Sequence, residues 1–175
     1  MSSTLSVLIP RGDIEYAVAR LGRQIGIDYS GCDLVAVGIL KGSFIFMADL
    51  VRQIGLPLEI DFVTVSSYGS GTKSPGNISV LHDLRVDVRD KDVLVIEDIV
   101  DSGHTISYVM KHIAEKGARS VRLCTLADKP SRRETPVHID YLGFTVPNKF
   151  VVGYGLDFDN KFRYLPDICA LENHD

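Results

Sequence analysis

Residues 93–105 read VLVIEDIVDSGHT, and this stretch decides the fold class. Its first four residues, VLVI, are typical of a buried strand, and two acids, Glu97 and Asp98, follow them. The loop DSGHT at 101–105 comes next and leads into a helical stripe of apolar residues. Open parallel sheets bind ligands where a strand ends and a helix begins. We therefore predict an α/β protein with its ligand site at this loop.

The side chains of this stretch suit a phosphorylated sugar. A helix N-terminus offers free backbone N–H groups and the positive end of the helix dipole, which together favour a phosphate. Ser102 and Thr105 add hydroxyl donors, and Gly103 lets the backbone close round the anion. Glu97 and Asp98 cannot bind that phosphate, but they suit sugar hydroxyls or a hard cation such as Mg²⁺. The alternative is a solvated pair of acids at a strand end, with the loop aspartate as a simple helix cap.

The sequence on both sides of the motif alternates strands and helices. The predicted strands are 34–40, 58–65, 78–81, 93–96 and 121–126, and the predicted helices begin with Asp13 as N-cap, span 43–54, and run from Ile106 to a stop at Gly117. Residues 66–77, with three glycines and a proline, predict a mobile loop. Such alternation predicts a parallel sheet with helices on both faces. We expect one domain over residues 1–175, with a core at roughly 30–135 and a smaller cap from the C-terminal third and the N-terminal helix.

The composition argues against several classes of protein. The net charge is −4 and the pI about 5.7, so the overall balance offers no support for nucleic-acid binding. No segment approaches the roughly 20 apolar residues of a membrane helix, and the N-terminus does not resemble a signal peptide. The three cysteines, Cys32, Cys124 and Cys169, lack zinc or redox spacing. We expect a cytoplasmic protein with reduced, mostly buried thiols and with neither membrane nor nucleic acid as partner.

The motif VLVIEDIVDSGHT resembles the phosphoribosyl-diphosphate (PRPP) motif of type I phosphoribosyltransferases. Four further segments carry the resemblance: ILKGSFIFMADL at 39–50, SSYGSGTKS at 66–74, TLADKPSRR at 125–133 and FVVGYGLDFDNKFRYLPDI at 150–168. Their order and spacing are similar to those of bacterial-type hypoxanthine(-guanine) phosphoribosyltransferases over nearly the whole chain. The resemblance implies the type I phosphoribosyltransferase fold, a parallel sheet core flanked by helices with a small hood formed by the terminal segments.

The resemblance also assigns the residues that bind PRPP. Glu97 and Asp98 correspond to the acids that bind the ribose hydroxyls, directly or through Mg²⁺. Asp101 corresponds to an aspartate near N7 of the purine that is proposed as the general base. The loop that holds the 5′-phosphate corresponds to Asp101, Ser102, Gly103, His104 and Thr105, and His104 is expected to contribute only its backbone.

A second group of residues is implied to bind pyrophosphate and to cover the site. Lys41 and Gly42 match the pyrophosphate loop, in which the family can hold a cis peptide, here Leu40–Lys41. Arg163 matches an arginine that contacts pyrophosphate. Further family roles fall on Asp157, at a second Mg²⁺, and on the lid pair Ser67 and Tyr68, which would keep an oxocarbenium-like sugar from water. The alternatives are Lys41 in solvent at an ordinary turn, and an idle surface loop in place of the lid.

A third group is implied to recognise the purine base. Lys129 resembles the lysine that donates to the exocyclic oxygen at position 6. Phe150 would stack on the ring, Val151 would contact the base through its backbone, and Asp157 lies beside them in the family. Without the resemblance, Lys129 with Arg132 and Arg133 would be a solvated charge run, and Phe150 an ordinary core aromatic.

The implied reaction is purine salvage, in which hypoxanthine or guanine reacts with PRPP to give IMP or GMP and pyrophosphate, with Mg²⁺ as cofactor. The nearest alternative is an enzyme that prefers xanthine, because the contacts at purine position 2 are not visible in the sequence. An alternative of another class is a nucleic-acid-binding regulator on the same fold, and a third is a purely structural module. The family forms dimers or tetramers, so a homodimer or homotetramer is expected.

Overall fold

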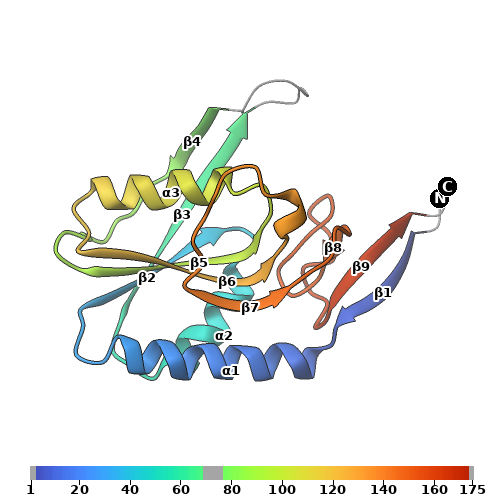
Figure 1. The fold of residues 1–175 in the computed structure, drawn as a ribbon, viewed down its shortest axis with the longest axis horizontal. Helices are drawn as coiled ribbons and strands as arrows, with labels where there is room; N and C mark the ends of the chain where they lie inside the picture. The colour runs from blue at the N-terminus through green and yellow to red at the C-terminus, as the bar shows by residue number, and fades with distance from the viewer. Residues whose placement is uncertain (1–2, 69–76, 174–175) are drawn as a thin grey trace.

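The computed structural model describes residues 3–68 and 77–173. Within these residues, one sheet has the strand order β4-β3-β2-β5-β6-β7 and a second, smaller sheet has the order β1-β9-β8 (Figure 1). The strands are β1 (Ser3–Ile9), β2 (Leu34–Leu40), β3 (Glu59–Tyr68), β4 (Asn77–His82), β5 (Asp92–Val100), β6 (Ser120–Asp128), β7 (Tyr141–Thr145), β8 (Val151–Val152) and β9 (Ile168–Asn173). The helices are α1 (Arg11–Asp28), α2 (Phe44–Ile54), α3 (His104–Glu115) and the short 3₁₀ helix η1 (Pro130–Arg132).

The two central strands of the large sheet are β2 and β5. They pair in parallel with each other, and parallel β3 and β6 flank them. β2 (LVAVGIL) and β5 (DVLVIEDIV) are buried along nearly their whole length, because helices cover both faces of the sheet. The sheet therefore presents the C-terminal ends of β2 and β5 side by side.

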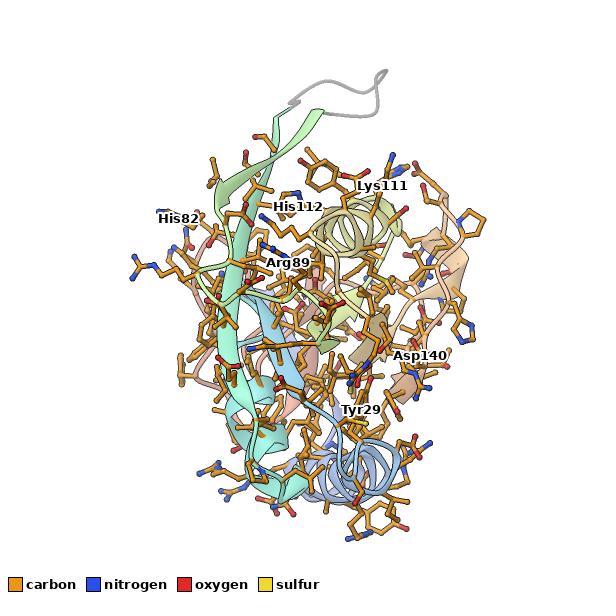
Figure 2. The ribbon with its side chains drawn as sticks, turned by 90° about the vertical axis from the view of Figure 1, so that its left-hand side faces the viewer. Tyr29, His82, Arg89, Lys111, His112 and Asp140 are labelled. Carbon is orange, nitrogen blue, oxygen red and sulfur yellow. The ribbon has the colours of Figure 1, made fainter. Side chains whose placement is uncertain are left out.

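Each face of the large sheet has its own apolar core. Ile14, Leu21 and Ile25 of α1 pack with Phe46 and Leu50 of α2 against one face. On the opposite face, α3 contributes the apolar residues Ile106, Val109 and Ile113. Figure 2 looks along α1 and α3 and shows them on opposite sides of the sheet. The prediction of a parallel α/β sheet with helices on both faces is confirmed.

The terminal segments form the small sheet, which we call the hood. β9 pairs antiparallel with β1 on one side and with β8 on the other. Helix α1, however, contacts α2 and β7 of the large sheet. The expectation that the N-terminal helix joins the cap is therefore wrong, because its apolar face is buried against the large sheet, and β1 supplies the N-terminal part of the hood instead.

Several predicted element boundaries are corrected. Helix α1 begins at Arg11 behind the extended Pro10, so Asp13 lies in the first turn and is not the N-cap. The strands β3 and β4 extend to Tyr68 and from Asn77, so both ends of the predicted loop at 66–77 are strand. The remainder of that predicted loop, 69–76, lies outside the described residues.

Strand β5 also runs further than predicted. It passes through Glu97 and Asp98 to Val100, because Ile99 and Val100 continue the ladder with Ala127 and Asp128 of β6. The two acids are therefore inside a paired strand, and the ligand loop begins only at Asp101. None of the helices in residues 3–68 and 77–173 combines the length and apolar character that a bilayer crossing requires.

Candidate active site

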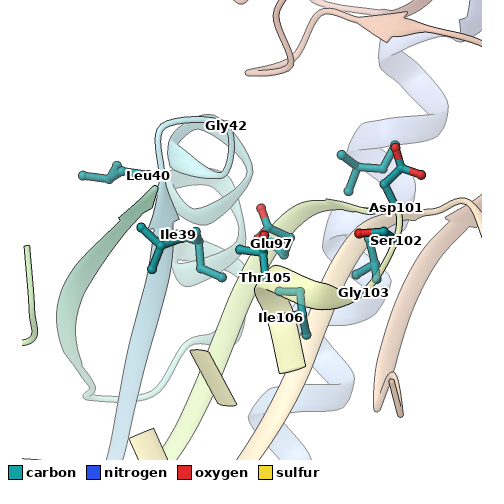
Figure 3. Close-up of a pocket in the computed structure, with 12 residues that line it drawn as sticks. Ile39, Leu40, Gly42, Glu97, Asp101, Ser102, Gly103, Thr105 and Ile106 are labelled. Carbon is teal, nitrogen blue, oxygen red and sulfur yellow. The ribbon is translucent and has the colours of Figure 1, made fainter. Parts of the chain in front are cut away.

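A polar cavity of about 270 Å³ lies at the C-terminal ends of β2 and β5, and we call it the phosphate cavity. The loop after β5 forms one wall and the loop after β2 the other (Figure 3). The lining residues that the sequence singled out are Gly42, Glu97, Asp101, Ser102, Gly103 and Thr105. The structure thus brings together the predicted phosphate loop, one predicted acid and one pyrophosphate residue.

Gly103 shapes the start of helix α3 at this cavity. It caps the helix with φ 90°, a left-handed conformation that favours glycine. A Cβ at this position would lie 2.4 Å from the backbone oxygen of Thr135. The tight turn directs the N-terminal end of α3 at the cavity that Ser102 and Thr105 also line, where first-turn N–H groups have no partner within the helix.

The acids Glu97 and Asp98 are buried, with 7% and 8% of their surface exposed. Burial first, and then repulsion from Asp98, raises the pKa of Glu97 well above its usual range. Asp98 faces the loop after β2, since a Cβ on Gly42 would lie 1.7 Å from its Oδ2. A cation near this pair would relieve both the desolvation and the repulsion.

A second cavity, of about 500 Å³, lies beside the first, and we call it the base cavity. All four predicted purine-binding residues line it: Lys129, Phe150, Val151 and Asp157. Lys129 is only 7% exposed, so the alternative of a solvated charge run is wrong for this residue. Phe150 is 51% exposed and meets Phe158 edge to face at 5.4 Å, so it is not a core aromatic. An exposed ring face in a cavity suits stacking on a flat base.

The two cavities meet at two residues of one segment. Ile99 and Asp101 line both of them, whereas Glu97 lines only the phosphate cavity and Asp98 only the base cavity. Asp101 therefore occupies the one position of the loop from which it can reach ligands in both cavities.

The predicted pyrophosphate residues are less closely gathered. The Leu40–Lys41 peptide is cis. In the described part of the chain, Lys41 is exposed and outside both cavities, whereas Gly42 lines the phosphate cavity. Arg163 lies 2.6 Å from Asp157 in an ion pair and also donates to the backbone oxygen of Gly155. The arginine and the acid assigned to pyrophosphate and metal thus contact each other in this structure.

The lid pair falls at the edge of what the structure describes. Ser67 and Tyr68 are the last residues of β3, where they pair with Ile78 and Asn77 of β4. Their side chains lie outside the described part of the structure, as do residues 69–76. The lid therefore stays a prediction.

The segment 132–135 supports the ligand loop, and sequence reasoning missed this role. Glu134 N and Thr135 N donate to the backbone oxygen of Ser102. His104 lies between their side chains, with Nε2 2.8 Å from Glu134 Oε2 and Nδ1 2.7 Å from Thr135 Oγ1. The imidazole thus points to this segment, and His104 does not line either cavity in the described part of the chain.

The same segment also contacts the proposed general base. Arg133 donates to the backbone oxygens of Val100 and Asp101 and is ion-paired with Asp128, while Arg132 pairs with the Asp101 carboxylate. The basic pair after Lys129 was the available signal in the sequence. The partners on β5 and its loop, Val100 and Asp101, were not visible there, because 31 to 33 residues separate them from the two arginines and only the β5–β6 pairing brings them together.

The acids fit a metal that is shared with a substrate. Within residues 3–68 and 77–173, no three His, Cys, Asp or Glu side chains gather into a group able to hold a metal ion. Mg²⁺ commonly binds through one or two carboxylates and completes its shell with water and substrate phosphates. The buried pair Glu97 and Asp98 fits that kind of site.

Comparison with known proteins identifies the class to which this fold and site belong. Residues 10–159 match the family model described as a phosphoribosyl transferase domain, so the chain is a phosphoribosyltransferase. The chain is 49% identical over 168 residues to hypoxanthine phosphoribosyltransferase of Salmonella typhimurium, which covers 95% of this chain and 94% of that protein.

Two further relatives narrow the assignment. Hypoxanthine-guanine phosphoribosyltransferase of Mycobacterium avium is 46% identical over 95% of this chain and 85% of its own length. A crystal structure of a hypoxanthine phosphoribosyltransferase from Staphylococcus aureus superposes with a TM-score of 0.92 at 43% identity, over 95% of this chain and 91% of that one. The chain belongs to the hypoxanthine(-guanine) phosphoribosyltransferase family.

Proposed function

We propose that this chain transfers the 5-phosphoribosyl group of PRPP to N9 of hypoxanthine or guanine, giving IMP or GMP and pyrophosphate, as a step of purine salvage. The junction of the two cavities carries the proposal, since Ile99 and Asp101 line both. A sugar phosphate in the first cavity presents C1′ toward a base in the second. The names of the relatives from Salmonella typhimurium and Mycobacterium avium agree with these two bases.

On the PRPP side, the 5′-phosphate binds at the N-terminus of α3. Ser102 and Thr105 donate their hydroxyls, and the backbone N–H groups of the loop through His104 donate as well. Glu97 and Asp98 bind the ribose hydroxyls. Charge that builds on the ribose ring as the bond to pyrophosphate lengthens is stabilised by these two carboxylates, which burial keeps away from water.

On the purine side, Lys129 donates from its ammonium to the oxygen at position 6, which disfavours the amino group of adenine. Phe150 stacks on the ring, and Val151 and Asp157 border the base. Asp101 accepts or holds the proton of N7 while N9 attacks C1′. This reaction proceeds without a covalent intermediate on the enzyme.

Pyrophosphate is bound by the loop of Lys41 and Gly42 together with Arg163, and Ser67 and Tyr68 close over the reacting centre. Glu97 and Asp98 would hold a Mg²⁺ ion, and Asp157 would hold one on the pyrophosphate side; such an ion would supply positive charge to neutralise the leaving group. The ion pair of Arg163 with Asp157 opens when these ligands bind, since each partner then has a ligand of its own.

A base-by-base assay tests the proposal. Pyrophosphate release from PRPP is measured with hypoxanthine, guanine, xanthine and adenine, with and without Mg²⁺. We expect kcat/KM for hypoxanthine or guanine to exceed that for xanthine and adenine by at least about a hundredfold, because a mismatched polar contact in a desolvated site is costly. Equal or better turnover of xanthine would contradict this proposal and favour a xanthine-preferring enzyme. Binding of RNA or DNA at physiological salt, without turnover, would favour the regulator.

The proposal includes a homo-oligomer, either a dimer or a tetramer, in the cytoplasm. Phe44, Ile60 and Phe62 form an exposed apolar patch where α2 meets β3, with 43%, 48% and 36% of their surface exposed. We call it the α2–β3 patch, and a second copy of this chain is its proposed occupant. The cysteines Cys32, Cys124 and Cys169 are free, which fits a reducing compartment.

A further inference from the structure

Arg132 contacts the one loop residue that both cavities share. Its Nε donates to Oδ1 of Asp101 across 3.2 Å, and it lines the base cavity beside that carboxylate. Arg132 ends η1, directly after β6, whereas Asp101 follows β5. The ion pair therefore joins the loops after two neighbouring strands at the base-facing side of the site.

The backbone on both sides of this ion pair is held by other contacts. Arg133 donates from Nε to the backbone oxygen of Asp101 (3.1 Å) and from Nη2 to that of Val100 (3.3 Å). Lys129 N donates to the same Val100 oxygen (3.0 Å), and Arg132 N donates to the oxygen of Lys129 (3.1 Å). Because the main chain is fixed in this way, the freedom left to Asp101 is rotation of its carboxylate.

Arg132 restricts that rotation. Within residues 3–68 and 77–173, the hydrogen bond from Arg132 is the one that the Asp101 carboxylate accepts, and it uses Oδ1. The second oxygen, Oδ2, stays available for a ligand. A general base must hold its oxygen within hydrogen-bond reach of the proton that it accepts, so a carboxylate anchored by one oxygen is oriented for the other to act.

We propose that Arg132 is a positioning residue, which anchors Oδ1 of Asp101 so that Oδ2 faces N7 of the bound purine. The proposal rests on the proposed function, since it takes Asp101 as the group that meets N7. Arg132 itself forms no bond to the reacting atoms. Its side chain and that of Asp101 are 54% and 43% exposed, and a pair so exposed contributes little to folding. Its loss therefore appears in the rate of the chemical step rather than in stability.

A double-mutant cycle tests the proposal. The single-turnover rate of IMP formation and the KM for hypoxanthine are measured for the unmodified chain, Arg132→Ala, Asp101→Asn and the double variant. We expect Arg132→Ala to slow the single-turnover rate about fivefold and to change the KM for hypoxanthine less than about twofold. In the Asp101→Asn background, Arg132→Ala should have almost no further effect, because the carboxylate that it orients is no longer there. Arg132→Lys, which retains a donor, should recover part of the rate.

The outcomes separate the two proposals. If Arg132→Ala slows both backgrounds by the same factor, Arg132 does not act through Asp101 and the inference is overturned. If Asp101→Asn alone keeps the unmodified rate, the role assigned to Asp101 under the proposed function fails instead. Lys111→Ala is the matched control, since it removes an equal charge from α3, on which Figure 2 shows Lys111. Lys111 is 77% exposed and pairs with Glu115. If Lys111→Ala slows the single-turnover rate by the same factor, the effect of Arg132→Ala comes from the change in net charge, and the inference is also overturned.

Discussion

Gly42 shows how closely the site is packed at the scale of single atoms. A methyl group there would lie 1.7 Å from Oδ2 of Asp98. The loop after β2 can therefore lie against the acid of β5 only because residue 42 is a glycine. This is a contact that no property of either residue alone predicts. The sequence indicated Gly42 and Asp98 as ligand residues through family resemblance, but their mutual contact requires the parallel pairing of β2 with β5.

Gly42→Ala tests this contact. We expect the added methyl group to displace the Asp98 carboxylate or the loop and to raise the KM for PRPP about tenfold or more, a loss of about 1.4 kcal/mol. Steady-state kinetics with varied PRPP measure it. Gly12→Ala is the control, because nothing lies within 4 Å of a Cβ at that position of α1. The control should leave the KM unchanged and stabilise the fold by about 0.5–1 kcal/mol. An unchanged KM in Gly42→Ala would mean that this contact plays no part in binding PRPP.

Lys129 carries the choice of base in the proposed function. A hydrogen bond from a charged donor contributes about 1.5–3 kcal/mol. Lys129→Ala should therefore lower kcat/KM for hypoxanthine and guanine by about ten- to a hundredfold, while that for adenine, which offers no oxygen at position 6, changes little or rises. The ratio of kcat/KM values for hypoxanthine and adenine measures the effect. A variant that keeps its ratio would show that another group recognises position 6.

At the scale of elements, the central strands and helices were predictable, and their ends and pairings were not. Apolar runs and the 3.6-residue stripe locate β2, β5 and α3 because burial on one or both faces dictates composition. The extension of β5 to Val100 depends on its ladder with β6, which is a long-range contact. For the same reason, the support that residues 132–135 give to the ligand loop could not be derived from local sequence.

An ion pair joins Asp92, the first residue of β5, to Arg119, the residue before β6, and it predicts a pH dependence. Asp92 of β5 is buried, and hydrogen bonds from Arg119 and Ser120 lower its pKa from 3.8 to about 2 despite that burial. Because the folded pKa is the lower one, the unfolded chain binds more protons between these values. This contribution to stability is present above about pH 4 and is lost as the pH falls toward 2.

We expect Asp92→Asn to lower the free energy of unfolding by about 2 kcal/mol at pH 7. Urea unfolding is measured at a series of pH values from 7 to 3. The difference in the free energy of unfolding between the variant and the unmodified chain should decrease as the pH falls. Asp87→Asn is the control, because Asp87 is 72% exposed and its pair with Arg89 is long, at 3.8 Å; it should change stability by less than about 0.5 kcal/mol. If this difference in the free energy of unfolding stays constant with pH, the lost stability comes from packing rather than from the charge of Asp92.

At the scale of the whole molecule, the division into a large sheet and a hood builds the site from distant parts of the chain. The phosphate cavity lies at the ends of β2 and β5, whereas the hood and its connections supply Phe150, Val151 and Asp157 to the base cavity. Alternation of elements predicted the large sheet, and the cap was expected from the C-terminal third. Family resemblance predicted a hood from both terminal segments, and the pairing of β1 with β9 confirms it, but that the N-terminal part is a strand was not expected, since a strand whose partner lies about 160 residues away leaves no local signal.

The α2–β3 patch lies on the large sheet, and its proposed burial against a second copy predicts the effect of a charge there. Phe62→Glu would place a carboxylate in the contact, where desolvation without a partner is costly. We expect the dissociation constant of the oligomer to rise about tenfold or more, with the circular dichroism of the fold retained. Sedimentation velocity across a dilution series measures it. Ile27→Glu, at a position of α1 that is 77% exposed and outside the patch, should leave the assembly unchanged. If Phe62→Glu sediments like the unmodified chain at every concentration, the subunits associate through another face.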